Sequence, residues 1–479
     1  MRSIPVLFAV AIAVPACATA QQSAISLDTG AVRRFVDSVI TSGMERERIP
    51  GAAFVLVKDG RVQMMKGYGV ADVARRTRVA PESTIFRIGS ISKVFTAVAL
   101  VQLADRGRID MLDDVNRYLR RIRVGSEFAE PVTGEQLLDH TAGFDEIRPG
   151  TQAPTAGAVL PLAEFLTGKL IRVRPPGRTI SYSTYGITLA GEMIEEVSGG
   201  PFESYLAREV WGPLGMTRTN ITVPQSLASS VATGYDAVHD SVVEAQWEWY
   251  HTTPASSVNT TAADMARFMI AMLNDGAIGD ARILSPRAAR YMQVQHVTMH
   301  PRIPGVALGL YEDFVGDVRV LEHGGQVAGF SSQMVLVPEA KLGFFIVSHL
   351  ENGRLRDVVR QALLGELFPA ARMRLPVAAP PADFATRAAR FAGRYAPITS
   401  CHSCTPRSVP AILTVTANAD GTLGFTGSKW IEVAPLLFVR EGGTGYISFR
   451  ADSSGTTTQM FAGGVWSWER LPSPGGGGH

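Results

Sequence analysis

Residues 86–96, FRIGSISKVFT, decide the fold, because they place Ser90 three residues before Lys93 at the start of an apolar helix. Residues three apart on a helix share one face, so the Lys93 amine reaches the Ser90 hydroxyl. A serine attacks a carbonyl only when a base takes its proton or a positive field stabilises the alkoxide. The first-turn amides add to that field. The stretch therefore predicts a nucleophilic serine whose own amide helps to bind an oxyanion.

Ser-x-x-Lys alone is a weak pattern, and the alternative is a helix cap followed by a solvated lysine. The helix that follows, residues 94–104 (VFTAVALVQLA), is apolar on nearly every face, which predicts that it is buried. A lysine on a buried helix is rarely incidental, so the context favours a functional Lys93.

Composition sets the broad class. The chain has 479 residues, of which 46% are hydrophobic and 19% charged, enough for one large core and a smaller second domain. A net charge of +2 gives no indication that the chain binds nucleic acid or an acidic membrane surface. Beyond the first twenty residues, no hydrophobic run is long enough to span a bilayer.

Residues 1–20 are typical of a secretory signal peptide, with Arg2, an apolar run and an Ala-x-Ala cleavage site that ends at Ala20. They predict export to the periplasm or beyond, with the mature protein starting at Gln21. The alternative is a lipoprotein signal in which Cys17 is acylated, but Pro15 fits that signal poorly.

Two cysteines, Cys401 and Cys404, remain after such cleavage, spaced as CHSC. Disulfides persist in oxidising compartments, so a local structural bridge is favoured. A redox dithiol lacks its usual βαβ context, and a metal site needs two further ligands besides His402.

The order of elements predicts an α+β domain with an inserted helical lobe. Strands at both ends share one antiparallel sheet, helices fill the middle, and a cleft between the lobes is the natural site. The expected strands are residues 52–58, 61–68, 318–322, 333–337 and 342–348, and the expected helices are residues 30–44, 186–197 and 355–367, one that follows Ser90 and one that starts at Thr261.

The C-terminal part differs in texture. Short apolar runs separated by Gly, Asp and Ser turns predict a small β-barrel. These runs are residues 411–416, 423–426, 436–440, 446–450 and 459–461. The expected boundaries are a main domain at 21–371, a linker at 372–385, the barrel at 386–473 and a flexible tail at 474–479.

A second motif lies in residues 179–186, TISYSTYG, where Tyr182 stands at the entry to a helix. A buried tyrosine with a capped hydroxyl is the alternative reading. Near Lys93, however, a phenol can be pushed toward phenolate and serve as a general base.

A third motif, residues 322–326 (EHGGQ), follows an expected strand. Gly324 and Gly325 on an edge strand let a substrate backbone approach closely. The Gln326 amide then completes an oxyanion hole with that of Ser90. His323 alone is ambiguous, because a turn histidine is often structural.

With these motifs in this order, the chain resembles the penicillin-recognising serine hydrolases, which include class C-type β-lactamases, D-alanyl-D-alanine carboxypeptidases, D-aminopeptidases and family VIII esterases. Ser90 to Lys93 resembles the Ser-x-x-Lys element, Tyr182 to Thr184 the Tyr-x-Asn element, and His323 to Gly325 the Lys-Thr-Gly element in its His-x-Gly form. Supporting stretches are residues 137–143, 213–217 and 260–268, and the likeness spans residues 32–368.

The resemblance implies a β-lactamase/transpeptidase-like fold, acyl-enzyme chemistry, and neither cofactor nor metal. Ser90, Lys93 and Tyr182 would be catalytic, with the oxyanion held by the amides of Ser90 and Gln326. Substrate would be bound by Thr184, His323, Gly324 and Gly325.

Two departures argue against an efficient β-lactamase. Thr184 replaces an asparagine, which removes an amide contact. His323 replaces a lysine, so carboxylate recognition is expected to be weaker and dependent on pH.

The C-terminal barrel resembles, through residues 391–395 (FAGRY), the lipocalin-like domain of some of these hydrolases. The expected function is an exported serine hydrolase of small-molecule esters, amides or peptides, peptidoglycan-derived ones included, with an esterase or D-residue peptidase favoured. The alternatives are a β-lactamase and a non-catalytic peptidoglycan- or penicillin-binding protein.

Other enzyme classes fit poorly. The sequence has no Gly-x-Ser-x-Gly elbow and no His-Glu-x-x-His motif. His296 and His300 have helical metal-ligand spacing, but no further ligand stands nearby in the sequence.

Overall fold

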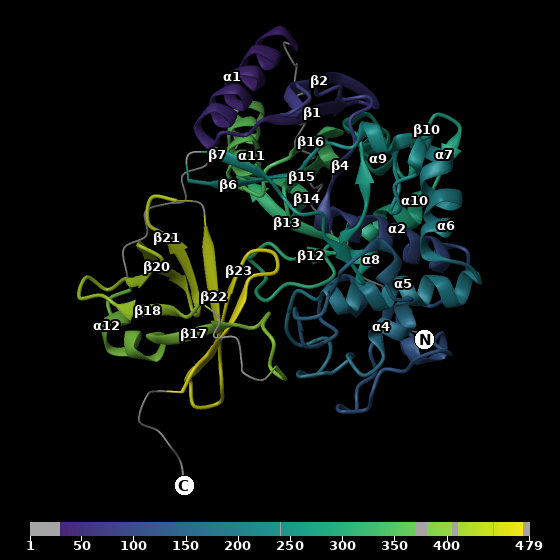
Figure 1. The fold of residues 1–479 in the computed structure, drawn as a ribbon. Helices are drawn as coiled ribbons and strands as arrows, with labels where there is room; N and C mark the ends of the chain where they lie inside the picture. The colour runs from purple at the N-terminus through teal and green to yellow at the C-terminus, as the bar shows by residue number, and fades with distance from the viewer. Residues whose placement is uncertain (1–28, 240, 370–380, 405–410, 444, 473–479) are drawn as a thin grey trace, which may run out of the picture.

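The computed structural model describes residues 29–239, 241–369, 381–404, 411–443 and 445–472. They form a mixed α+β domain with a helical lobe, followed by a closed β-barrel (Figure 1). The fold class expected from the sequence is confirmed. The expected signal peptide at 1–20, Cys17 and the tail at 474–479 lie outside the described residues.

One antiparallel sheet joins the two ends of the main domain, as expected. Strand β1 pairs with β16 on one side and with the hairpin partner β2 on the other. Within the described residues the sheet has the order β12 (Val306–Ala307), β13 (Leu310–Val315), β14 (Val318–Val327), β15 (Phe330–Val337), β16 (Leu342–Ser348), β1 (Gly51–Lys58), β2 (Arg61–Asp72) and β3 (Thr77–Arg78).

Both faces of the sheet are covered, which explains the nearly continuous apolar run in β1. Alternate residues point to opposite faces of a strand. Val55 packs into the core beneath α2 (Ser92–Asp105) and α9 (Ala262–Leu273). Phe54 packs into the second core, beneath α1 (Thr29–Glu47) and α11 (Arg354–Leu367).

The helical lobe holds α2 at its centre. Every residue of α2 from Ser92 to Leu103 is buried, in line with its apolar sequence. The other lobe helices are α3 (Gly134–Leu138), α4 (Leu162–Leu166), α5 (Thr184–Ser198), α6 (Phe202–Leu206), α7 (Gly212–Leu214), α8 (Thr253–Ser256) and α10 (Pro286–Gln293). Short strand pairs link them: β4 (Phe86–Arg87) with β9 (Asn259–Thr260), β5 (Gln152–Ala153) with β8 (Trp249–Tyr250), β6 (Tyr235–Val238) with β7 (Ser241–Glu244), and β10 (Ala277–Ile278) with β11 (Ala281–Arg282).

Helix α9 begins where expected, with only half of a capping box. The Thr261 hydroxyl accepts the Asp264 amide at 3.1 Å. The Asp264 carboxylate turns away and accepts the Arg218 amide and the Thr219 hydroxyl instead. A tertiary contact therefore replaces the local one.

The barrel closes through eight described strands around aromatic side chains, among them Phe391 and Phe438. Three of the strands, β17, β20 and β24, are not among the apolar runs that indicate the barrel in the sequence. Within the expected linker, residues 372–380 lie outside the described part of the chain, and α12 (Phe384–Arg387) begins near its end. The barrel strands are β17 (Gly393–Pro397), β18 (Leu413–Ala417), β19 (Leu423–Phe425), β20 (Ser428–Ala434), β21 (Leu437–Arg440), β22 (Tyr446–Ala451), β23 (Thr457–Ala462) and β24 (Ser467–Arg470).

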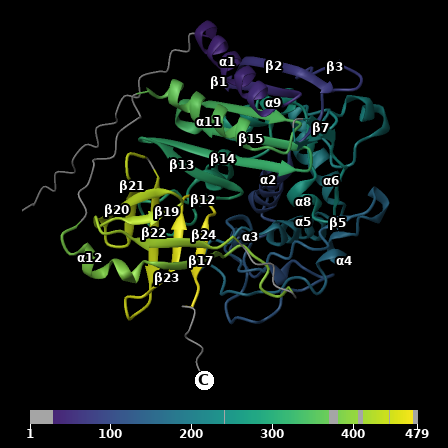
Figure 2. The same ribbon diagram turned by 60° about the vertical axis from the view of Figure 1, so that its left-hand side comes forward.

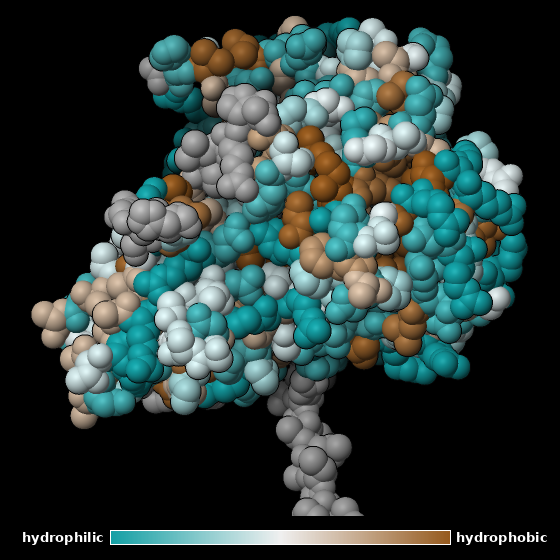
Figure 3. Space-filling model, turned by 90° about the horizontal axis from the view of Figure 1, so that it is seen from below, coloured by the Kyte–Doolittle hydropathy of each residue, from teal (hydrophilic) through white to brown (hydrophobic). Residues whose placement is uncertain are grey.

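The barrel lies against the main domain, as both ribbon views show (Figure 2). Arg174 forms a 2.8 Å ion pair with Glu469 of β24. Arg450 of β22 donates to the carbonyl of Arg178 at 3.0 Å. Seen from below, the surface mixes hydrophilic and hydrophobic groups (Figure 3). Searched over the described residues, no helix has the length and apolar character needed to cross a membrane.

Candidate active site

Ser90 stands in a single 3-10 turn, Gly89–Ile91, directly before α2. Ser92 fixes this turn from behind, because its hydroxyl donates to the Gly89 carbonyl at 2.6 Å and accepts the Val258 amide at 3.0 Å. The turn exposes the Ser90 hydroxyl to the cleft while its neighbours stay buried.

Lys93 is only 1% exposed and its amine faces Ser90. The Nζ atom lies 3.2 Å from Ser90 Oγ and 2.9 Å from the Ala255 carbonyl oxygen of α8. A buried charge is costly unless it is hydrogen-bonded or paired. Both contacts hold the Lys93 amine inside the site, beside Ser90 and Ala255. A solvated lysine would not make them.

Tyr182, which lies just before α5, is the second side chain in contact with Ser90. Its hydroxyl donates to Ser90 Oγ at 2.9 Å, and Lys93 Nζ lies 4.8 Å from the centre of its ring. The next residue, Ser183, is the N-cap of α5, and its hydroxyl accepts the Gly186 amide at 3.0 Å. The start of α5 therefore sets the place of the phenol, and Ser90 Oγ lies between a phenol and an amine.

The glycines of β14 let that strand run directly against the Ser90 turn. A side chain on Gly325 would place its Cβ 1.8 Å from the Ile88 carbonyl oxygen. A Cβ on Gly89 would lie 2.7 Å from the Gln326 nitrogen. The backbone at Gln326 thus adjoins the nucleophile turn, where two amides could act on one carbonyl oxygen.

His323 is neutral in this environment. It is 1% exposed, and burial, with Lys93 nearby, lowers its pKa to about 3. Its Nδ1 hydrogen-bonds the Gly324 carbonyl at 2.7 Å, so Nδ1 carries the proton. With a pKa of about 3 the ring stays neutral between pH 5 and 8. Its surroundings therefore do not favour the pH-dependent recognition of a carboxylate that the sequence leads us to expect.

Thr184 turns away from the cleft. Its amide donates to Glu146 Oε2 at 2.8 Å, and a hydrogen bond from its side chain also reaches this buried carboxyl. Thr184 is not among the residues that line the cleft, whereas Ser90, Tyr182, His323 and its neighbours Gly324 to Gln326 are.

The cleft has a volume of about 820 Å³ and contains groups that the sequence motifs do not reveal. Arg356 of α11 donates to the Gly325 carbonyl at 2.6 Å. Its Nε has no hydrogen-bond partner in the described part of the chain and lies 3.7 Å from Asp357 Oδ1. Tyr311 of β13 packs its ring 4.5 Å from that of His323. Burial raises the pKa of Tyr311 well above its usual range, and charge and hydrogen bonding at Tyr182 raise it further.

The barrel supplies one wall of the cleft. Residues 463–468, between β23 and β24 and at the start of β24, line it together with Pro397 and Thr399. Trp466 is 65% exposed there, and its ring stacks on that of Trp468 at 6.5 Å. Only the glycine and aromatic content of this turn is visible in the sequence, which does not reveal its position beside Ser90.

A disulfide joins Cys401 and Cys404, the pairing favoured by the sequence. The small loop that it closes sits on Asp145, a fully buried carboxylate of the lobe. Asp145 accepts the amides of His402 and Ser403 at 2.8 and 2.9 Å and the Ser403 hydroxyl at 2.7 Å. The loop thus ties the barrel to the segment next to Glu146.

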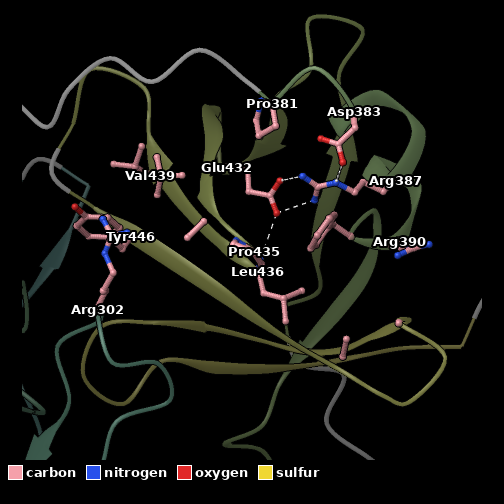
Figure 4. Close-up of a pocket in the computed structure, with 15 residues that line it drawn as sticks. Arg302, Pro381, Asp383, Arg387, Arg390, Glu432, Pro435, Leu436, Val439 and Tyr446 are labelled. Carbon is pink, nitrogen blue, oxygen red and sulfur yellow. Dashed lines mark hydrogen bonds and ion pairs between the residues drawn. The ribbon is translucent and has the colours of Figure 1, made fainter.

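Two other features carry no site. His296 lies 3.3 Å from Glu135, and in the described ranges no group of three or more His, Cys, Asp or Glu is arranged to hold a metal ion. A second cavity, of about 860 Å³, opens on the barrel (Figure 4). The buried Glu432 in its wall accepts from Arg387, which also donates to Asp383 at 3.0 Å, so these three charges are paired with one another.

Sequence comparisons add relatives of low identity. Protein flp of Staphylococcus aureus strain N315 is 25% identical over 321 residues, which cover 66% of this chain and 63% of that protein. Beta-lactamase-like protein 2 of Dictyostelium discoideum is 25% identical over 347 residues, 70% of this chain and 62% of the relative. The matched region thus spans less than two thirds of the length of these curated relatives.

Solved structures share the fold of the larger part of the chain. The octameric penicillin-binding protein homologue from Pyrococcus abyssi is 21% identical with a TM-score of 0.63, and it covers 92% of this chain and 100% of its own. A structure titled as that of SurE is 23% identical with a TM-score of 0.65, and it covers 92% of this chain and 99% of its own.

The family comparison covers the sheet, the lobe and every sequence motif around Ser90. The family model described as Beta-lactamase matches residues 36–366, which is more than half of the chain. Together with the shared fold, this match shows that the chain belongs to the beta-lactamase family.

Proposed function

We propose that this protein is an exported serine hydrolase that works through an acyl-enzyme on ester, amide or D-peptide substrates. One observation carries the proposal: Ser90 Oγ lies 3.2 Å from Lys93 Nζ and 2.9 Å from the Tyr182 hydroxyl, at the floor of the cleft. A nucleophile within hydrogen-bond reach of its base is the geometric requirement of this chemistry.

Acylation starts when Ser90 Oγ attacks the substrate carbonyl carbon. The Ser90 proton passes to the Tyr182–Lys93 pair, which acts as base in the state that holds one proton fewer than a phenol and an ammonium. The carbonyl π electrons move to the oxygen, where the amides of Ser90 and Gln326 stabilise the charge. When the tetrahedral intermediate collapses, the bond to the leaving group breaks and the pair returns the proton to that group.

Deacylation repeats the sequence with water. The same pair takes a proton from water, the hydroxide adds to the acyl carbon, and the Ser90 oxygen leaves with the proton. The net reaction consumes one water and releases an acid and an alcohol or amine. No cofactor takes part.

The side chains around Ser90 favour an esterase or D-residue peptidase over a β-lactamase. A neutral His323 offers no fixed charge to a substrate carboxylate, and Thr184 faces Glu146. Arg356 is a cation of the cleft beside Gly324 and Gly325. A D-peptide whose carboxylate reaches Arg356 therefore suits the site, as does a short ester that needs no such contact.

Export is part of this proposal. It rests on the signal-like residues 1–20 and on the Cys401–Cys404 disulfide, a bond that persists in oxidising compartments. A peptidoglycan fragment would be a substrate available there. The rival from another class, a non-catalytic peptidoglycan- or penicillin-binding protein, has no need of both close contacts to Ser90.

The test is hydrolysis of a short-chain p-nitrophenyl ester by the protein without residues 1–20, beside its Ser90→Ala variant. Turnover that disappears in the variant supports the proposal and justifies assays with D-peptides and with nitrocefin. Equal turnover in both proteins would point to an unrecognised second site, and no turnover in either would favour the binding protein. Nitrocefin hydrolysis as fast as ester hydrolysis would reverse the preference against a β-lactamase.

A further inference from the structure

His140 packs against Tyr182 and accepts hydrogen bonds from Ser181 and Ser183, the two residues that flank this tyrosine. Its main-chain carbonyl accepts the Ser181 amide at 2.8 Å. Its ring Nδ1 accepts the Ser183 amide at 3.2 Å. A single residue therefore fixes the chain on each side of the tyrosine.

The His140 ring also backs the phenol. Its centre lies 4.7 Å from that of Tyr182, and the side chain is buried. The centre of the His140 ring also lies 6.3 Å from that of the Tyr311 ring. The phenol therefore has one aromatic ring behind it, while Lys93 Nζ lies 4.8 Å from its centre.

The surroundings of His140 favour a neutral ring. Burial lowers its pKa well below the usual range, and Lys93 and His323 nearby lower it further. A neutral ring that accepts at Nδ1 carries its proton on Nε2, and Nε2 has no partner among the described residues. The Nδ1 lone pair therefore stays available to the Ser183 amide.

His140 adopts a left-handed backbone, with φ of 63°. Most residues with a side chain avoid this region, whereas His, Asn and Asp tolerate it better. Such a conformation persists only when its surroundings hold it in place. Here the conformation lets the carbonyl and the ring of one residue face the two flanking amides.

We propose that His140 is the positioning residue of the general base: it holds the Tyr182 hydroxyl at hydrogen-bond distance from Ser90 by fixing Ser181 and Ser183 and by packing against the phenol. His140 is not among the residues that line the cleft. This inference rests on the proposed function, because it assigns a role within the same site.

The test compares His140→Leu, which removes the acceptor and the ring, with His140→Asn, which keeps an acceptor and tolerates the left-handed backbone. A shift of about 1 Å in a catalytic group can cost on the order of 100-fold in rate. We expect kcat of His140→Leu to fall at least about tenfold with KM within about twofold, and His140→Asn to recover part of the loss. In a Tyr182→Phe background, His140→Leu should cause little further loss.

His251→Leu is the matched control. His251 Nδ1 also accepts a backbone amide, that of Leu160 at 3.0 Å, and its ring also stacks on an aromatic ring, Phe165 at 5.1 Å. Any effect of this control should be the same with Tyr182 or Phe at position 182. An equal loss from His140→Leu in both backgrounds would mean a purely structural role and would overturn the inference.

Hydrogen exchange at the Ser183 amide separates this inference from the proposed function, because it needs no turnover. Faster exchange in His140→Leu than in His251→Leu is expected. Unchanged exchange would overturn the inference whatever the activity. Faster exchange in a protein whose wild type lacks Ser90-dependent turnover would instead uphold the positioning contact and refute the proposed function alone.

Discussion

Replacing Gly89 by alanine should displace one half of the oxyanion hole. Gly89 has φ of 53°, and a Cβ there would lie 2.7 Å from the Gln326 nitrogen. Ordinary contacts of a Cβ begin at 3.4 Å, so one of the two backbones must move by about 0.7 Å (3.4 minus 2.7). Neither backbone is free, because Ser92 holds the Gly89 turn and β15 pairs with β14.

The magnitude has two parts. The left-handed backbone costs an alanine roughly 1–2 kcal/mol, and forcing a methyl group into a packed site costs about 1–3 kcal/mol. Loss of one oxyanion donor lowers kcat by about 10²–10³. Because the amide of Gln326 shifts rather than disappears, we expect Gly89→Ala to reduce kcat about 10- to 100-fold.

Gly60→Ala is the matched control, measured with the same urea unfolding and p-nitrophenyl ester assays. Gly60 has φ of 73° in the turn between β1 and β2, and a Cβ there meets nothing within 4 Å. It should lose about 1–2 kcal/mol of stability and keep its kcat. If Gly89→Ala keeps the kcat of Gly60→Ala, the Gln326 amide is not an oxyanion donor and the reasoning is refuted.

Three further predictions concern single residues. The surroundings of His323 lower its pKa to about 3, so between about pH 6.5 and 3 the unfolded chain binds a proton that the folded chain does not. The contribution of His323 to the free energy of unfolding is therefore complete above about pH 6.5 and is lost as the pH falls toward 3, by up to about 1.4 kcal/mol per pH unit. When the free energy of unfolding is measured with urea at several pH values, its dependence on pH should be shallower in His323→Gln. An unchanged slope would contradict a buried neutral ring. Tyr182→Phe should lower kcat/KM of ester hydrolysis by about 10²–10⁴, and near-normal turnover would remove it as base. Asp145→Asn should speed amide exchange at His402 and Ser403 by about tenfold or more, because bonds to a charged acceptor become bonds to a neutral one; equal rates would show that the loop docks without the charge.

Local patterns are enough to predict most of the main domain. Apolar runs mark β1, β15 and β16, and α2 is buried as its uniform apolar sequence indicates. The barrel is harder, because short strands depend on their cross-strand neighbours. β20 (SKWIEVA) and β24 (SWER) carry charges that hide them, although pairing in the barrel makes them strands.

The site shows the same division. Ser90, Lys93 and Tyr182 are recognisable because each stands in a short motif, and the structure brings all three together. The charge of His323 is not predictable from its motif, because burial sets it. Arg356 enters from α11 with no local signal. The segment 137–143 is visible in the sequence, yet only the fold places His140 behind the phenol.

The most direct test of the central claim is to acid-quench the protein during turnover of a p-nitrophenyl ester and to locate any acyl group by mass spectrometry of its peptides. The account predicts an acyl adduct on the peptide that contains Ser90, absent from Ser90→Ala. Slower deacylation should increase the adduct in variants of the Tyr182–Lys93 pair that still acylate. Turnover with the acyl group on another residue, or an adduct that persists in Ser90→Ala, would contradict the account.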